Sequence, residues 1–87
     1  MFLMHPKTIH EAVALVLTQM SGRDKLIVRN TPKEDLIKLH LGWGNEIRNQ
    51  CGLWEGNDDL IRDAGAEHPD GASIKVMEAA WEEIQKT

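Results

Sequence analysis

An apolar stripe that crosses two glycines is the feature that most constrains the fold of this chain. At 100° per residue, Leu36 and Ile47 fall on the same side of one helix over about residues 32–51. Gly42 and Gly44 interrupt that helix, and each costs about 1 kcal/mol relative to alanine in a helix interior. Because the stripe stays in phase across both glycines, the sequence predicts one long helix. A break at the glycines is the alternative.

The ends of this helix carry their own signals. Thr31 suits the N-cap, Pro32 the first helical position, and Glu34 completes a capping box. Gly52 is a natural C-terminal stop. Gly44 lies at the edge of the apolar stripe, where a missing side chain lets a neighbouring helix come close.

Capping residues also predict the remaining helices. Thr8 and Ser21 each precede an apolar pattern of helical period, although residues 25–29 could also form a strand. Asn57 starts another short helix, and a long amphipathic helix ends the chain. The sequence therefore predicts an all-α fold: a compact bundle of four to five helices in a single domain, residues 1–87, with the long third helix central. The expected ranges of the other helices are about 9–20, 23–29, 58–64 and 69–85.

Charge and composition limit the possible partners. The chain of 87 residues has a formal net charge of −4, and no basic cluster that would indicate nucleic-acid binding. Residues 1–54 carry seven Lys/Arg and five Asp/Glu, whereas residues 55–87 carry three and nine. These two segments therefore have balances of +2 and −6. The acidic last third could face a basic protein partner or the basic front of a second copy in a homodimer. The alternative is a solvated helix face, which is the commoner role of a charge run. The apolar residues left over for such an interface are Phe2, Leu3, Met4 and Leu41.

Classical catalytic and metal-binding signals are weak. The single cysteine, Cys51, excludes an internal disulfide, and it lies on the apolar stripe like a small buried hydrophobe. His5 and His10 are five residues apart rather than three or four, so they do not form a helical metal pair. We therefore expect no catalytic residue, metal or cofactor. With no signal peptide and no apolar run long enough for a membrane helix, we expect a cytoplasmic location and no membrane contact.

Four residues could still line a ligand site. His40 lies at the centre of the apolar arc, Arg48 at its edge, and Trp43 and Trp54 could stack on a ligand. The alternative is structural: tryptophans usually form the core, and a buried arginine usually meets an internal carboxylate. That carboxylate would come from one of four residues. They are Asp58, Asp59, Asp63 and Asp70.

A longer pattern resembles a known family. Its main part is Ile47-Arg48-Asn49, Gly52-Leu53-Trp54 and Gly56-Asn57. It is preceded by Arg29-Asn30-Thr31-Pro32 and followed by a second part, His68-Pro69-Asp70 and Ala72-Ser73. It is similar to a family of small bacterial all-helical domains of unknown function, over about residues 9–85. The resemblance implies a compact bacterial domain and supplies no activity or ligand.

Two functions remain open. The first, which we favour, is a non-enzymatic interaction or regulatory domain that associates with itself or with another protein. The alternative is a protein or enzyme that binds a small anion or metabolite in a pocket around His40, Trp43, Arg48 and Trp54.

Overall fold

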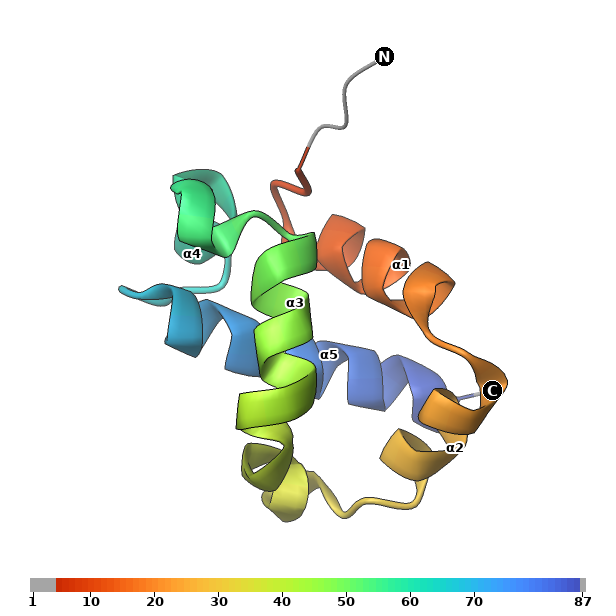
Figure 1. The fold of residues 1–87 in the computed structure, drawn as a ribbon. Helices are drawn as coiled ribbons and strands as arrows, with labels where there is room; N and C mark the ends of the chain where they lie inside the picture. Colours follow the sequence, from red (N-terminus) through yellow and green to blue (C-terminus); the bar gives the residue numbers. More distant parts are fainter. Residues whose placement is uncertain (1–4, 87) are drawn as a thin grey trace.

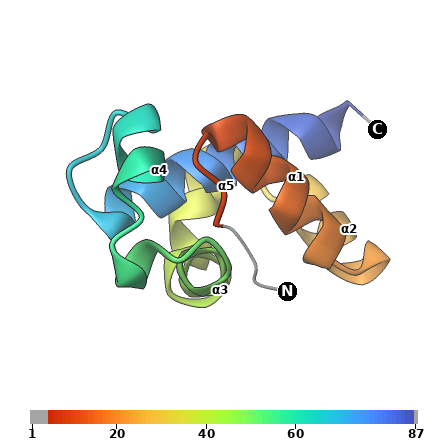
Figure 2. The ribbon, with the colours of Figure 1, turned by 90° about the horizontal axis from the view of Figure 1, so that it is seen from above.

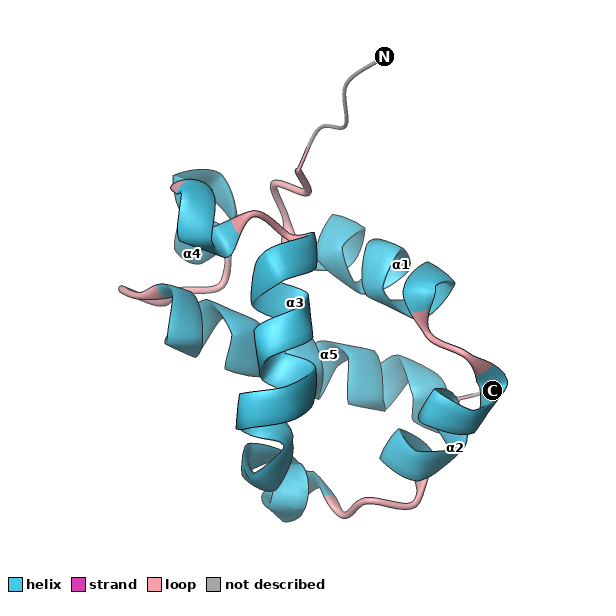
Figure 3. Ribbon diagram, viewed as in Figure 1, coloured by secondary structure: helices cyan, strands magenta, loops and turns pink. Residues whose placement is uncertain are grey.

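The computed structural model describes residues 5–86, and in that part it contains helices and no strand (Figures 1 and 3). The predicted all-α fold is therefore confirmed. Three further helical segments, named η1 to η3, lie among five α-helices. In chain order the elements are α1 (Ile9–Gln19), α2 (Gly22–Arg29), η1 (Lys33–Leu39), η2 (His40–Gly44), α3 (Asn45–Gln50), η3 (Leu53–Glu55), α4 (Asp58–Asp63) and α5 (Pro69–Gln85).

Helix α5 is the element that every other element touches. The stretch that ends in α3 crosses in front of α5 in Figure 1, and α1 packs on α5 beside it. Helix α4 lies near the start of α5 and α2 lies near its end, as both ribbon views show (Figures 1 and 2). None of the described helices is long and apolar enough to cross a bilayer.

The first two helices begin where their capping residues predict. The Thr8 side chain accepts a hydrogen bond from the backbone N–H of Glu11, and Ser21 accepts one from Asp24. Each bond satisfies one of the N–H groups that a helix start leaves without an intrahelical partner. The helix over 22–29 is confirmed and the alternative strand is not formed.

The central helix has the predicted position but not the predicted uniform geometry. A continuous helical stretch runs from Lys33 to Gln50, but it is a 3-10 helix in η1, a π-helix in η2 and an α-helix only in α3. The π turn coincides with Gly42 and Gly44, which lack the side chains that restrict the backbone elsewhere. The glycines therefore change the type of helix without breaking it.

The predicted cap at Thr31 is wrong. No side chain caps η1, which begins at Lys33. The Thr31 hydroxyl instead donates to the carbonyl of Ile27 at 2.8 Å, at the end of α2. Its backbone carbonyl accepts from Trp81 Nε1 at 2.7 Å. Thr31 thus fixes the connection to α5, because threonine can bond backward to a carbonyl as readily as forward to an N–H.

The apolar stripe of the central stretch forms the core with α1 and α5. Leu36, Ile47 and Cys51 are buried as predicted, while Trp43 is half-buried. Gly44 is also buried, at the crossing with α5. The other buried residues of this core are Ala12, Val13, Val16, Leu53, Leu60, Ala72, Val76, Met77 and Ala80.

A glycine and an asparagine shape the connection that carries Trp54. Gly52 has φ 66°, a left-handed conformation, and a Cβ there would overlap the ring of His5. Asn57 Nδ2 donates to the carbonyls of Pro6 and Cys51, each at 2.7 Å. These contacts hold η3 against the chain before α1 and leave Trp54 exposed.

The two glycines of the π turn should respond oppositely to substitution. A Cβ on Gly44 would lie 3.2 Å from Arg48 Nη1 and 3.3 Å from Met77 Sδ, whereas one on Gly42 meets nothing within 4 Å. We expect Gly44→Leu to lower the free energy of unfolding by about 1–3 kcal/mol through overpacking. Gly42→Ala should be neutral or stabilising by up to about 1 kcal/mol. Urea unfolding measures both, and equal responses would contradict this packing.

Candidate functional site

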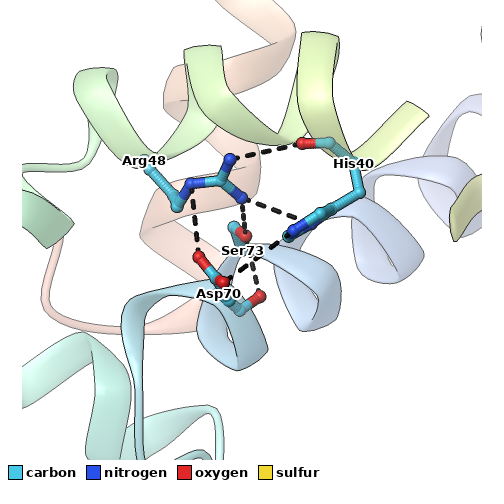
Figure 4. Close-up of polar contacts among 4 residues, drawn as sticks. All are labelled: His40, Arg48, Asp70 and Ser73. Carbon is cyan, nitrogen blue, oxygen red and sulfur yellow. Dashed lines mark hydrogen bonds and ion pairs between the residues drawn. The ribbon is translucent and has the colours of Figure 1, made fainter. Parts of the chain in front are cut away.

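Among residues 5–86, Arg48 is the charged side chain that the fold buries. It leaves α3 toward the first turn of α5 and is only 4% exposed (Figure 4). Its Nη1 donates to Ser73 Oγ at 2.9 Å and contacts His40 Nδ1 at 3.3 Å. Its Nη2 donates to the carbonyl of His40 at 3.3 Å. One guanidinium therefore binds the π turn and α5 together, which its rigid fork of donors allows.

The contact with Arg48 fixes the tautomer of neutral His40. A guanidinium has only donors, so Nδ1 of the imidazole must be the acceptor and the proton lies on Nε2. Nε2 faces Asp70 Oδ2 at 3.9 Å (Figure 4). The ring of His40, placed by sequence at the centre of the apolar arc, is thus held between a cation and a carboxylate at the edge of the core.

Asp70 and Ser73 enter the site from the first turn of α5, three residues apart on one face. Ser73 Oγ accepts from Arg48 and donates to the backbone carbonyl of Asp70 at 2.8 Å. The Asp70 carboxylate is 60% exposed, and its Oδ1 lies 3.7 Å from Arg48 Nε. Among the described residues, Nε is the buried side-chain polar atom that has no hydrogen bond. Of the four expected carboxylates, Asp70 is therefore the one near the guanidinium.

Trp54 covers the guanidinium of Arg48. The central carbon of the guanidinium lies 5.4 Å from the centroid of the indole ring, within the range of a cation–π contact. The indole remains more than half exposed. Its position follows from η3, which Gly52 and Asn57 hold in place.

Trp43 lies elsewhere. It lines a hollow between α2 and α3 together with Met20 and Leu39. The structure thus brings His40, Arg48 and Trp54 into one cluster around Asp70 and Ser73, while Trp43 belongs to a different surface. A ligand-binding role for these four residues stays a prediction. The sequence analysis did not identify Ser73 as a site residue. Its hydroxyl lies on the apolar face of the last helix, and a buried hydroxyl there needs a hydrogen-bond partner, which could have indicated its role.

The comparison with protein families gives a match over residues 5–84, to the family described as "Domain of unknown function (DUF6794)". The chain belongs to this family. No curated protein and no solved structure gives a significant match to the chain. The expected kinship with a family of unknown function is confirmed, and the family description itself assigns no activity.

In this DUF6794 domain, the two sequence patterns that carry the resemblance meet in space. Arg48 and Trp54 come from the first pattern, and Asp70 and Ser73 come from the second. The contacts among them join α3, η3 and α5. Residues that are about 20 positions apart in sequence therefore form one polar joint.

The polar groups of this cluster are mainly engaged in contacts that hold the helices together. The Ser73 hydroxyl is fully buried and gives its proton to a carbonyl, so it is not oriented as a nucleophile. His40 Nδ1 is engaged by a cation. Asp70 and the outer face of Trp54 are the parts of this cluster most open to a solute, and the ring of His40 is partly exposed.

Cys51 behaves as the sequence predicted for a small buried hydrophobe. It is fully buried and free, and desolvation by burial raises the pKa of its thiol to about 11. A protonated, inaccessible thiol is a poor nucleophile and a poor metal ligand. Within residues 5–86, no group of three or more His, Cys, Asp or Glu is placed to hold a metal ion.

Loss of the guanidinium fork should destabilise the domain more than loss of the carboxylate. We expect Arg48→Lys to lower the free energy of unfolding by about 2–4 kcal/mol, because an ammonium cannot serve Ser73 and His40 together and leaves buried acceptors unpaired. Asp70→Asn is the matched control. Its long, solvent-exposed ion pairs should contribute less than about 1 kcal/mol. Urea unfolding measures both, and a larger effect of Asp70→Asn would contradict this order.

The Cys51 thiol should react only when the domain opens. At pH 8, a pKa of about 11 instead of the ordinary 9.0 reduces the thiolate fraction by about 100-fold, and burial excludes the reagent as well. Labelling with a thiol-reactive disulfide should be slow in buffer and fast in urea. Fast labelling of the folded protein would contradict the burial.

The raised thiol pKa also fixes the sign of a pH effect. The unfolded chain loses the Cys51 proton first, near pH 9.0, while the folded protein keeps it to about pH 11. The contribution of Cys51 to stability is therefore complete below pH 9.0 and is lost as pH rises toward 11. Cys51→Ala, measured over the same pH range, should lack this part of the alkaline loss.

Proposed function

We propose that this DUF6794 domain is a non-catalytic protein-interaction domain of the bacterial cytoplasm, one that associates with itself. The observation that supports this is a set of large apolar side chains more than half exposed on the described surface. Single exposed apolar residues are common, but two pairs occur here: Leu26 and Ile27 on α2, and Ile37 and Leu41 on the η1–η2 stretch. Trp54 is the fifth.

The two pairs belong to neighbouring parts of the molecule. Ile27 on α2 and Gly42, next to Leu41, line the same hollow. Helix α2 and the η1–η2 stretch occupy the lower part of Figure 1. Leu26 instead lines a separate hollow beside Ile84. Exposed apolar side chains beside a hollow, such as Ile27, are typical of a binding surface, because burying them against a partner removes apolar area from water.

Charge contributes less to self-association than the sequence suggested. Lys33 Nζ lies 2.8 Å from Glu82, so the basic segment, residues 1–54, and the acidic last third already form an ion pair within one molecule. This hydrogen bond and charge interaction raise the pKa of Lys33 and lower the pKa of Glu82. Arg48 and Asp70 pair in the same sense. The apolar surface rather than the charge balance therefore supports association. Phe2, Leu3 and Met4, which were also expected to contribute, lie outside the described residues.

A second candidate is binding of a small anion or metabolite beside Arg48. It is favoured by the half-exposed face of Trp54 over the guanidinium and by the lack of a hydrogen bond at Nε. An anion there would compete with the Asp70 carboxylate, which is only 3.7 Å away. This competition makes the site weaker than the interaction surface as a candidate.

Two measurements on the purified domain separate the candidates. We expect light scattering after size exclusion to give a mass above that of the monomer at high micromolar concentration, returning to the monomer with Leu41→Ser. A thermal-shift screen with phosphate, sulfate, citrate and nucleotides should give no stabilisation. A monomer that an anion stabilises by several degrees, with the shift lost in Arg48→Lys, would contradict the interaction proposal and support the second candidate.

A further inference from the structure

A hollow of about 240 Å³ lies between α2 and the stretch from Leu39 to Gln50. Its apolar walls come from Met20, Val28, Leu39 and Trp43, all buried or half-buried, with Ile27 exposed beside them. Gly42 stands at the hollow with open space where a Cβ would be. The fold therefore leaves apolar side chains partly uncovered here.

The size of the hollow indicates what it can hold. Pockets for drug-sized ligands measure about 300–1,000 Å³, and a cavity of about 150 Å³ already binds benzene. A volume of about 240 Å³ therefore suits one large apolar side chain. Interfaces commonly place such an anchor in a pocket at their centre.

The charge around the hollow is one-sided. Its polar lining includes the exposed carboxylates of Asp24 and Glu46, and no Lys or Arg is among the lining residues. An occupant with a positive charge beside its apolar side chain is therefore electrostatically complementary.

The domain itself carries a segment of this kind. Leu41 is 83% exposed, the most exposed of the large apolar residues on the described surface. Residues 36–45 contain Lys38 and no carboxylate. The Lys38 side chain is 73% exposed, and its Nζ lies 3.4 Å from Asp35, a distance typical of a weak surface pair that can rearrange.

We infer that the hollow receives Leu41 of a second copy of this chain, in a two-fold dimer where each copy inserts its leucine into the other. Leu41 follows His40 and precedes Gly42 in the π turn, so the leucine and the hollow share one patch. Such a self-complementary patch is what a two-fold interface requires. Lys38 of each copy approaches Asp24 and Glu46 of the other. This inference rests on the proposed interaction function and names its partner.

Sedimentation equilibrium of the full chain tests the location of the interface. We expect a weak dimer, with a dissociation constant of about 10–100 μM for a small interface. Gly42→Leu should fill the hollow without an internal clash and weaken the dimer at least about tenfold, and Leu41→Ser should do the same. Gly22→Leu is the matched control, because Gly22 also has open space around it and does not line this hollow. It should leave the constant unchanged. Circular dichroism confirms that each variant is folded.

A charge-reversal experiment gives a readout that misfolding cannot imitate. Lys38→Glu in one preparation and Asp24→Lys with Glu46→Lys in another should each weaken self-association. Mixing the two should restore a heterodimer, because in a two-fold arrangement both sets of opposite charges are re-formed. Failure of the mixture to associate more tightly than either variant alone would overturn the Lys38 pairing.

The outcomes separate this inference from the function on which it rests. A dimer that persists equally in Gly42→Leu and Gly22→Leu overturns the hollow as the interface and leaves the interaction function in place. A wild-type chain that remains monomeric at 1 mM overturns the second copy as the occupant and also the self-association in the proposed function, and it leaves only interaction with a different protein. If that monomer is also stabilised by an anion through Arg48, the interaction function fails as well.

Discussion

The buried guanidinium of Arg48 is the interaction on which the joint between the central stretch and α5 depends. It contacts a hydroxyl on α5, a ring and a carbonyl in the π turn, and an indole from η3. Removing a charge from water is expensive unless its donors are satisfied. The neighbours satisfy Nη1 and Nη2, and the Asp70 carboxylate lies 3.7 Å from the remaining donor, Nε. The orientation of three elements is therefore coupled to one side chain.

The π turn makes this coupling possible. Eight residues separate His40 from Arg48, and a uniform α-helix at 100° per residue would place them about 80° apart. A π turn holds more residues per turn and so rotates less per residue, which brings Arg48 closer to the face of His40. Gly44 completes the geometry, because a Cβ there would be 3.2 Å from Arg48 Nη1 and 3.4 Å from His40 Nδ1. The missing side chain is thus a condition for seating the guanidinium, and it also permits the close approach of Met77 from α5.

Helix starts and the buried face of the central stretch could be predicted from the sequence, whereas the tertiary partners of individual side chains could not. Thr8 and Ser21 announce helix starts because their side chains act within three residues, and the apolar period gave the buried face of the central stretch. Thr31 has the same local signature, yet its hydroxyl bonds backward and its carbonyl serves Trp81, a competition that only the tertiary contact decides. Arg48 was expected to meet one of four aspartates, but choosing Asp70 requires knowing how α5 crosses α3. The π turn could not be predicted for a related reason. The glycines allow this backbone geometry, but the contacts of Arg48 with His40 that accompany it are tertiary.

The same turn that seats the arginine on its inner side leaves Leu41 exposed and Gly42 open on its outer side. The core is complete without either residue, since Leu36, Ile47 and Met77 are already buried. Burying two reciprocal leucines would contribute about 3–6 kcal/mol before any loss, whereas association itself costs about 4–15 kcal/mol. Leucine burial alone is smaller than this cost over most of the range, so Ile27 and Ile37 would have to share in any stable contact. The self-association proposed for this domain should then depend on its concentration.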